Sequence, residues 1–159
     1  MGFLTGKTAI ITGAGRAVLK DGSCGSIGYG IATAYAKEGA NLVITGRNVK
    51  KLEAAKQELE SLYGIKVLTV QADVCAGGNN EATVANVVKQ AVDTFGGIQV
   101  LINNAQASAS GVPLTEHTTE QFDLAIYSGL YAAFYYMKAC YPYPVSYTHL
   151  RAHETRSNL

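Results

Sequence analysis

The chain has 159 residues, of which 48% are hydrophobic, and it carries a formal net charge of +1 at pH 7. That length and apolar content suit one globular domain with a buried core, and a near-neutral charge without blocks of like sign argues against nucleic acid or an anionic membrane as partner. Because no apolar run reaches the roughly 20 residues of a membrane span and the first residues lack signal-peptide features, we expect a cytoplasmic protein.

The first predicted unit, residues 7–30, is a strand, a glycine-rich turn and the start of a helix. Residues 7–12 form a short β-branched run that stops at Gly13-Ala14-Gly15, as a buried parallel strand ends in a turn. After an irregular segment, Ser26 is a good N-cap for a helix over residues 26–38. Such a turn lets the backbone approach a pyrophosphate at the helix N-terminus, although a turn without a ligand would carry similar residues.

Three more strands alternate with three more helices. Strands are predicted over residues 41–45, 66–70 and 98–102. The four helices are assigned from apolar residues at helical spacing, namely Ile27, Ile31, Ala34 and Tyr35; Val49, Leu52, Ala55, Leu59 and Leu62; Val84, Val87, Val88, Ala91, Val92 and Phe95; and Phe122, Ile126, Leu130, Phe134 and Met137 over about residues 119–140. Strands that alternate with helices predict an α/β fold with a doubly wound, Rossmann-type parallel sheet.

Three motifs at the ends of predicted strands carry a family resemblance. Thr12-Gly13 with the later Gly28, Asp73-Val74, and Asn103-Asn104-Ala105 occur in this order and spacing. From about residue 6 to residue 141 the chain resembles the short-chain dehydrogenases/reductases.

The resemblance implies a dinucleotide site with three parts. The residues implied around the phosphates are Gly13, Gly15, Ser26, Ile27 and Gly28; those at the adenine are Asp73 and Val74; those on the nicotinamide side are Asn103, Ala105 and Gln106. Asp73 could instead cap a loop, and the two asparagines could satisfy backbone groups between strands. For Asn104 we expect that structural role.

The choice of cofactor depends on the end of the second strand. A site specific for NAD generally places a carboxylate there, whereas Gly46-Arg47 offers a guanidinium suited to a 2′-phosphate. NADP(H) is therefore favoured over NAD(H). The alternative is that Arg47 is a solvated loop residue.

The chain departs from the family pattern in the turn after the first strand. Several extra residues lie between Gly15 and Ser26. They could cover the adenosine phosphate, with Arg16 or Lys20 assisting Arg47, but an exposed insertion is favoured because surface loops lengthen at little cost in free energy. The Ser-Ile-Gly ending also resembles the divergent enoyl reductases, against which Asn-Asn-Ala argues.

Other departures concern catalysis. Gln106 stands where the family usually has glycine, and Gly129 where the long helix usually supplies a catalytic asparagine. The family also uses a serine and a Tyr-x-x-x-Lys motif, which this sequence lacks. We therefore expect residues 1–144 to be the N-terminal, cofactor-binding part of a Rossmann domain that is inactive by itself, and residues 145–159 to be a non-native tail that resembles a translated sequencing adapter.

Two residue patterns have competing interpretations. His149 and His153 lie four apart, but their place in the tail makes a zinc site the weaker reading, and three widely spaced cysteines indicate neither disulfides nor a metal cluster. Tyr127, Tyr131 and Tyr135 recur every four residues on the long helix. They could pack in the core or form the interface of the homo-oligomer that the resemblance implies.

Residues 26–32, 103–110 and 127–131 are similar to segments of bacterial bile-acid hydroxysteroid dehydrogenases. The resemblance implies hydride transfer between NADP(H) and a secondary alcohol or ketone, with a steroid as one candidate substrate. The alternative is a non-catalytic dinucleotide-binding module. Against it, the strand at 98–102 would then present an apolar open edge.

Overall fold

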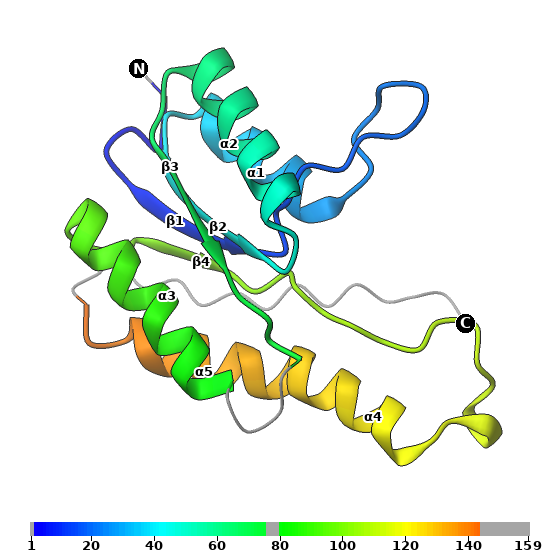
Figure 1. Ribbon diagram of the computed structural model, residues 1–159. Helices are drawn as coiled ribbons and strands as arrows, with labels where there is room; N and C mark the ends of the chain where they lie inside the picture. The colour runs from blue at the N-terminus through cyan, green and yellow to red at the C-terminus, as the bar shows by residue number, and fades with distance from the viewer. Residues whose placement is uncertain (1, 76–79, 144–159) are drawn as a thin grey trace.

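The computed structural model describes residues 2–75 and 80–143, which form three layers with a parallel sheet in the middle (Figure 1). The strands are β1 (Thr8–Thr12), β2 (Asn41–Gly46), β3 (Val67–Gln71) and β4 (Val100–Ile102). They pair in the order β3-β2-β1-β4, and every pairing is parallel. The predicted fold class is therefore confirmed. β2 and β3 are added on one side of β1, and β4 is added on the other side. The strand order therefore reverses between β1 and β4, and ligands bind at this switch point in folds of this kind.

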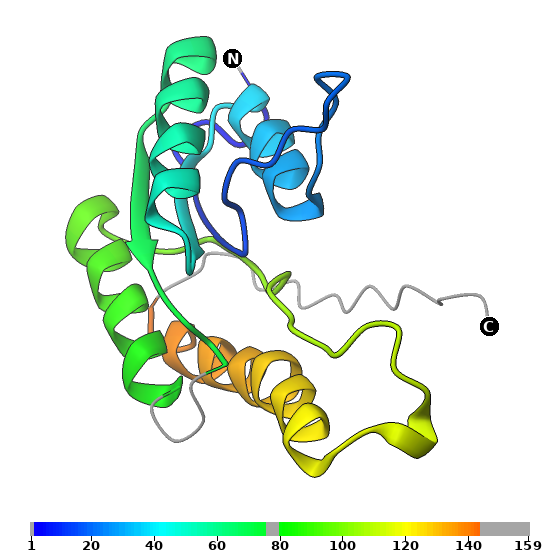
Figure 2. The ribbon, with the colours of Figure 1, turned by 45° about the vertical axis from the view of Figure 1, so that its right-hand side comes forward.

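The helices cover both faces of the sheet (Figures 1 and 2). One face carries α1 (Ile27–Lys37) and α2 (Val49–Tyr63), and the other carries α3 (Asn80–Phe95) and α5 (Ala132–Cys140). A short 3₁₀ turn, η2 (Leu114–Glu116), precedes α4 (Thr119–Ala125). The segment η3 (Ile126–Tyr131) is π-helical and joins α4 to α5 as one long helix.

The core lies on both sides of β1 and β2. Ala9 and Ile11 pack under α1 and α2, whereas Ile10 packs under α3 and α5, because successive side chains of a strand point to opposite faces. All five residues of β1 are buried. A strand covered on both faces reads as a continuous apolar run, which is why this one was predictable.

The predicted apolar face of the first helix is partly wrong. Ile31 and Tyr35 pack against the core, but Ile27 is 76% exposed and Ala34 is exposed. The residues of α1 that are buried are Gly28, Tyr29, Ala32 and Ala36. The contact surface is centred on small residues because the start of α1 packs closely against the turn after β1.

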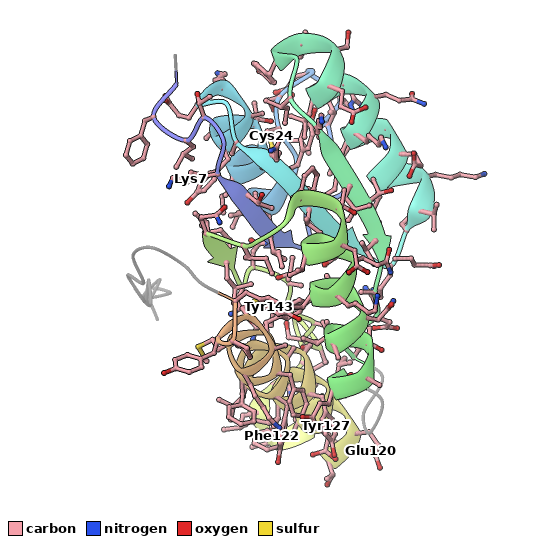
Figure 3. The ribbon with its side chains drawn as sticks, turned by 90° about the vertical axis from the view of Figure 1, so that its left-hand side faces the viewer. Lys7, Cys24, Glu120, Phe122, Tyr127 and Tyr143 are labelled. Carbon is pink, nitrogen blue, oxygen red and sulfur yellow. The ribbon has the colours of Figure 1, made fainter. Side chains whose placement is uncertain are left out.

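The predicted apolar face of the long helix does not line the core either. Phe122, Leu130 and Phe134 are more than half exposed, and the buried residues of η3 and α5 are Ser128, Ala132, Tyr136 and Cys140. Phe122, Leu130 and Phe134 thus stay on the exposed side along the whole helix, and the side that faces the core carries Ser128, Ala132, Tyr136 and Cys140 at a spacing of four residues. Figure 3 shows Phe122 near the end of this helix remote from Lys7 and Cys24.

Strand boundaries differ from prediction by one or two residues. The fourth strand begins at Val100 rather than at residue 98, because its ladder with β1 starts at the Ala9–Val100 pair. Within the described residues β4 is an edge strand. In this same part of the chain no helix has the length and apolarity to cross a membrane. The predicted tail, with its two histidines, lies outside the described residues.

Candidate functional site

The turn after β1 and the start of α1 fit together because of two glycines. Gly13 has φ +70°, a conformation that residues with a Cβ seldom adopt. A Cβ on Gly28 would lie 2.4 Å from the Gly13 carbonyl oxygen and 2.6 Å from the Asn104 side-chain nitrogen. The N-terminus of α1 therefore lies directly against this turn.

Ser26 caps α1 and closes the turn. Its hydroxyl accepts a hydrogen bond from the Tyr29 N–H at 3.4 Å and donates to the Gly15 carbonyl, also at 3.4 Å. The extra residues between Gly15 and Ser26 form a small hairpin with an antiparallel bridge between Val18 and Cys24. Residues 18–25 are all exposed, and the hairpin projects from the body of the molecule (Figure 1). The prediction of an exposed insertion is confirmed.

Arg16, at the base of this hairpin, is held by α2. Its N–H donates to the Lys51 carbonyl at 2.8 Å, and its guanidinium forms an ion pair with Glu58, which also accepts from the Tyr29 hydroxyl. The hydrogen bonds from Tyr29 and Arg16 lower the pKa of Glu58. Burial, followed by the contact with Glu58, raises the pKa of Tyr29 to about 12. Arg16 thus tethers the hairpin to two helices.

The loop after β4 is fixed to the end of β1. The Thr12 hydroxyl accepts hydrogen bonds from the N–H groups of Asn104 and Ala105, both at 2.9 Å. In return, the Asn104 side chain donates to the Thr12 carbonyl at 2.8 Å. The structural role expected for Asn104 is confirmed.

The π-helical segment holds two neighbouring loops. The Ser128 hydroxyl accepts from the Ala107 N–H at 2.9 Å and donates to the Leu124 carbonyl at 2.7 Å. The side-chain nitrogen of Asn80, which is fully buried, donates to the carbonyls of Val74 and Tyr127 at 2.5 and 3.2 Å. Sequence reasoning missed Thr12 as an anchor and missed Ser128 and Asn80 altogether. A serine within an otherwise apolar stretch of helix was the one available signal.

Two cavities open beside these loops, at the carboxyl ends of the strands. The larger, of about 200 Å³, is lined by Gly13, Thr45, Gly46, Arg47, Ala72, Asp73, Val74, Cys75, Asn104, Ala105, Gln106 and Ala107. The smaller, of about 160 Å³, is lined by Thr12, Val74, Asn103, Asn104, Ala105, Gln106, Ser128, Gly129, Ala132, Ala133 and Tyr136. Val74, Asn104, Ala105 and Gln106 line both, so the cavities are neighbours.

The structure thus brings seven of the predicted site residues to the cavity walls. They are Gly13, Arg47, Asp73, Val74, Asn103, Ala105 and Gln106. The other four, Gly15, Ser26, Ile27 and Gly28, form the adjoining turn and helix start rather than the walls. The Asp73 carboxylate accepts from the Cys75 N–H at 2.9 Å, which is the loop-capping contact considered as its alternative role. Burial raises the pKa of the Cys75 thiol.

Residues 7–149 match the family model described as short chain dehydrogenase. The chain belongs to the short-chain dehydrogenase family. It is 61% identical over 143 residues to the 12alpha-hydroxysteroid dehydrogenase of a Clostridium species, a match that covers 90% of this chain and 52% of that protein. It is also 36% identical over 141 residues to an uncharacterized oxidoreductase of Bacillus subtilis, over 88% and 45% of the two chains. The chain therefore spans about half the length of these curated relatives.

Solved structures of short-chain dehydrogenases share this architecture. L-sorbose reductase from Gluconobacter frateurii, solved with NADPH and L-sorbose, superposes with a TM-score of 0.74 at 31% identity, over 89% of this chain and 48% of that one. A metagenomic short-chain oxidoreductase in complex with NADP gives a TM-score of 0.74 at 28% identity, over 87% and 57% of the two chains. The parallel sheet and its helices are thus those of the family.

Proposed function

We propose that this chain binds NADP(H) as the cofactor-binding portion of an oxidoreductase that interconverts a secondary alcohol and a ketone. The observation that carries the proposal is the pair of adjoining cavities beside the α1 N-terminus, at the sheet's switch point. The identity to a 12alpha-hydroxysteroid dehydrogenase makes a hydroxysteroid the favoured substrate class.

A dinucleotide would have to span both cavities. Each is smaller than the roughly 300–1,000 Å³ typical of pockets that enclose a drug-sized ligand, but they adjoin along Val74, Asn104, Ala105 and Gln106. The proposed adenine contacts are Asp73 and Val74 in the larger cavity, and the proposed nicotinamide contacts are Asn103, Ala105 and Gln106. Between them the diphosphate would lie against the α1 N-terminus, where free N–H groups and the helix dipole favour an anion. Gly13, Gly15, Ser26, Ile27 and Gly28 would surround it.

The preference for NADP(H) over NAD(H) is supported by charge at the start of α2. Arg47, Lys50 and Lys51 cluster there, and the first turn of α2 has no acidic residue. Cations at the positive end of a helix dipole are unfavourable unless an anion lies among them. A 2′-phosphate beside Arg47 would be such an anion. Solved family members that hold NADPH or NADP support the same choice.

The cofactor would supply or accept the hydride, and the residues of this chain would bind and orient it. Protonation of the substrate oxygen needs a further acid, for which the family resemblance implies a tyrosine assisted by lysine. Because the sequence has no Tyr-x-x-x-Lys, we propose that the 159-residue chain binds the cofactor without turnover. Steady NADPH-dependent reduction of a ketosteroid by the purified chain would refute this part.

Calorimetric titration of the chain with NADPH and NADH tests the proposal. We expect NADPH to bind more tightly, and R47Q to weaken NADPH by about tenfold or more while NADH changes little, since a charge-assisted hydrogen bond contributes roughly 1.5–3 kcal/mol. K37Q, at the opposite end of the fold in the last turn of α1, is the matched control. Equal affinity for both dinucleotides would contradict the preference, and no binding of either would contradict the function.

A further inference from the structure

Gln106 and Gly129 share one space at the smaller cavity. A Cβ placed on Gly129 would meet three atoms of Gln106 first: the side-chain nitrogen at 3.4 Å, Cδ at 3.7 Å and Cγ at 3.8 Å. A side chain longer than alanine at position 129 would therefore occupy the place of the Gln106 carboxamide. The glycine on the helix makes room for the glutamine on the loop.

Neighbouring contacts fix both residues of this pair. Gly129 lies in the π-helical segment η3, and the preceding residue, Ser128, binds the N–H and approaches the carbonyl of Ala107. Ala107 follows Gln106 in the chain, and Ala105, which precedes Gln106, donates its N–H to the Thr12 hydroxyl. Gln106 is thus held by anchors on both flanking residues, and its side chain lies at the wall common to both cavities. π-Helical turns of this kind recur at functional sites.

We propose that the Gln106 carboxamide is a positioning group for the nicotinamide half of the cofactor, and that Gly129 is required to admit it. This inference rests on the proposed function. A carboxamide offers both donors and an acceptor, which suits the amide and ribose hydroxyls of a nicotinamide nucleoside. At the boundary of the two cavities, it would orient the part of the dinucleotide that enters the smaller one. The adenosine half, at the Arg47 end of the larger cavity, would not depend on it.

The test compares NADPH with 2′,5′-ADP, which has the adenosine half alone. Isothermal titration of the full 159-residue chain gives the affinity ratio of the two ligands for each variant. We expect Q106A to weaken NADPH by about five- to tenfold, the effect of one good hydrogen bond, and to change 2′,5′-ADP by less than about twofold. Q57A, which removes an exposed glutamine from α2, is the matched control and should change neither.

Moving the carboxamide from position 106 to position 129 separates positioning from a merely structural effect. G129N alone puts two carboxamides in one space and should weaken NADPH binding as Q106A does. The double variant Q106A/G129N supplies one carboxamide from the helix instead of the loop, and we expect it to regain most of the NADPH affinity. General damage to the fold would not be repaired by a second substitution.

Each outcome decides the inference. If the unsubstituted chain binds neither ligand, the proposed function fails and the inference fails with it. If it binds both ligands and Q106A leaves the ratio of the two affinities unchanged, the role assigned to Gln106 is wrong and the proposed function stands. The same holds if Q106A lowers both affinities equally. If Q106A lowers NADPH selectively and the double variant remains as weak, Gln106 positions the ligand but the pairing with Gly129 is overturned. Should G129N fail to fold, Q106A still decides the role of Gln106.

Discussion

Thr12 and Asn104 exchange hydrogen bonds across 92 residues of chain. The Thr12 hydroxyl accepts the Asn104 N–H at 2.9 Å, and the Asn104 side chain returns a hydrogen bond to the Thr12 carbonyl at 2.8 Å. Thr12 is the last residue of β1, and Asn104 lies just after the end of β4. These two strands are neighbours at the point where the order of strands in the sheet reverses. This exchange fixes the loop that carries Ala105 and Gln106, and so shapes both cavities.

The substitution T12V should destabilise the chain by about 2–4 kcal/mol. Thr12 is 2% exposed, and valine would leave the N–H groups of Asn104 and Ala105 without their partner, each at a cost of roughly 1–3 kcal/mol. Urea unfolding followed by circular dichroism measures the change. T12S keeps the hydroxyl and should lose less than half as much. Equal losses in the two variants would contradict the prediction, because the hydroxyl that T12V removes would then contribute no more than the methyl group that T12S removes.

The substitution S128A should loosen the segment after β4. It removes the acceptor of the Ala107 N–H, so we expect a loss of about 1–2 kcal/mol in unfolding free energy and faster amide hydrogen exchange at Ala107. Ser108 is exposed in the same loop, and S108A should stay within about 0.5 kcal/mol of the unsubstituted chain. Unchanged exchange at Ala107 in S128A would contradict the anchor.

The substitution G28A should disrupt the turn after β1, whereas G30A should not. A Cβ on Gly28 would approach the Gly13 carbonyl carbon to 2.9 Å and its oxygen to 2.4 Å, so overpacking by about 1–3 kcal/mol is expected together with loss of NADPH binding. At Gly30 the nearest atom is the Cys24 sulfur at 3.5 Å. In G30A, the higher helix propensity of alanine should raise the free energy of unfolding by at most about 1 kcal/mol. Thermal melts and titrations compare the two, and equal tolerance would refute the close approach.

Glu58 should give the chain an acid-sensitive component of stability. Its pKa in the folded state is lowered from 4.5 by hydrogen bonds from Tyr29 and Arg16, so its contribution is present above about pH 4.5 and disappears as pH falls through the lower folded value. E58Q should therefore melt at a lower temperature than the unsubstituted chain at pH 7, with a difference that shrinks below pH 4.5.

Melting temperatures from pH 7 to pH 3 measure this difference. D93N breaks the exposed Lys89–Asp93 pair and serves as the control, because solvent-exposed ion pairs contribute little. A constant gap between E58Q and the unsubstituted chain at every pH would exclude the ionic contribution and leave only packing.

The elements of the fold were predictable because they depend on local patterns. The buried runs of β1 and β2, the cap at Asn48 and the glycine stop at Gly64 all lie within a few residues of what they control. The faces of α1 and of the long helix were not predicted correctly. In α1, Gly28 lies against the turn after β1 and so sets which face is buried. In the long helix, the side that packs on the core carries Ser128, Ala132 and Tyr136, whereas the larger apolar stripe stays exposed.

By itself, the sequence determined the parallel α/β architecture, the order of its strands and helices, and the polar and glycine motifs that end the strands. These follow from side-chain periodicity and turn chemistry, which act between near neighbours in the chain. Tertiary structure decided which distant residues meet: Thr12 with Asn104, Ser128 with Ala107, and Gln106 with Gly129. Such contacts join residues 21 or more positions apart, and only packing of the helices on the sheet brings them within reach.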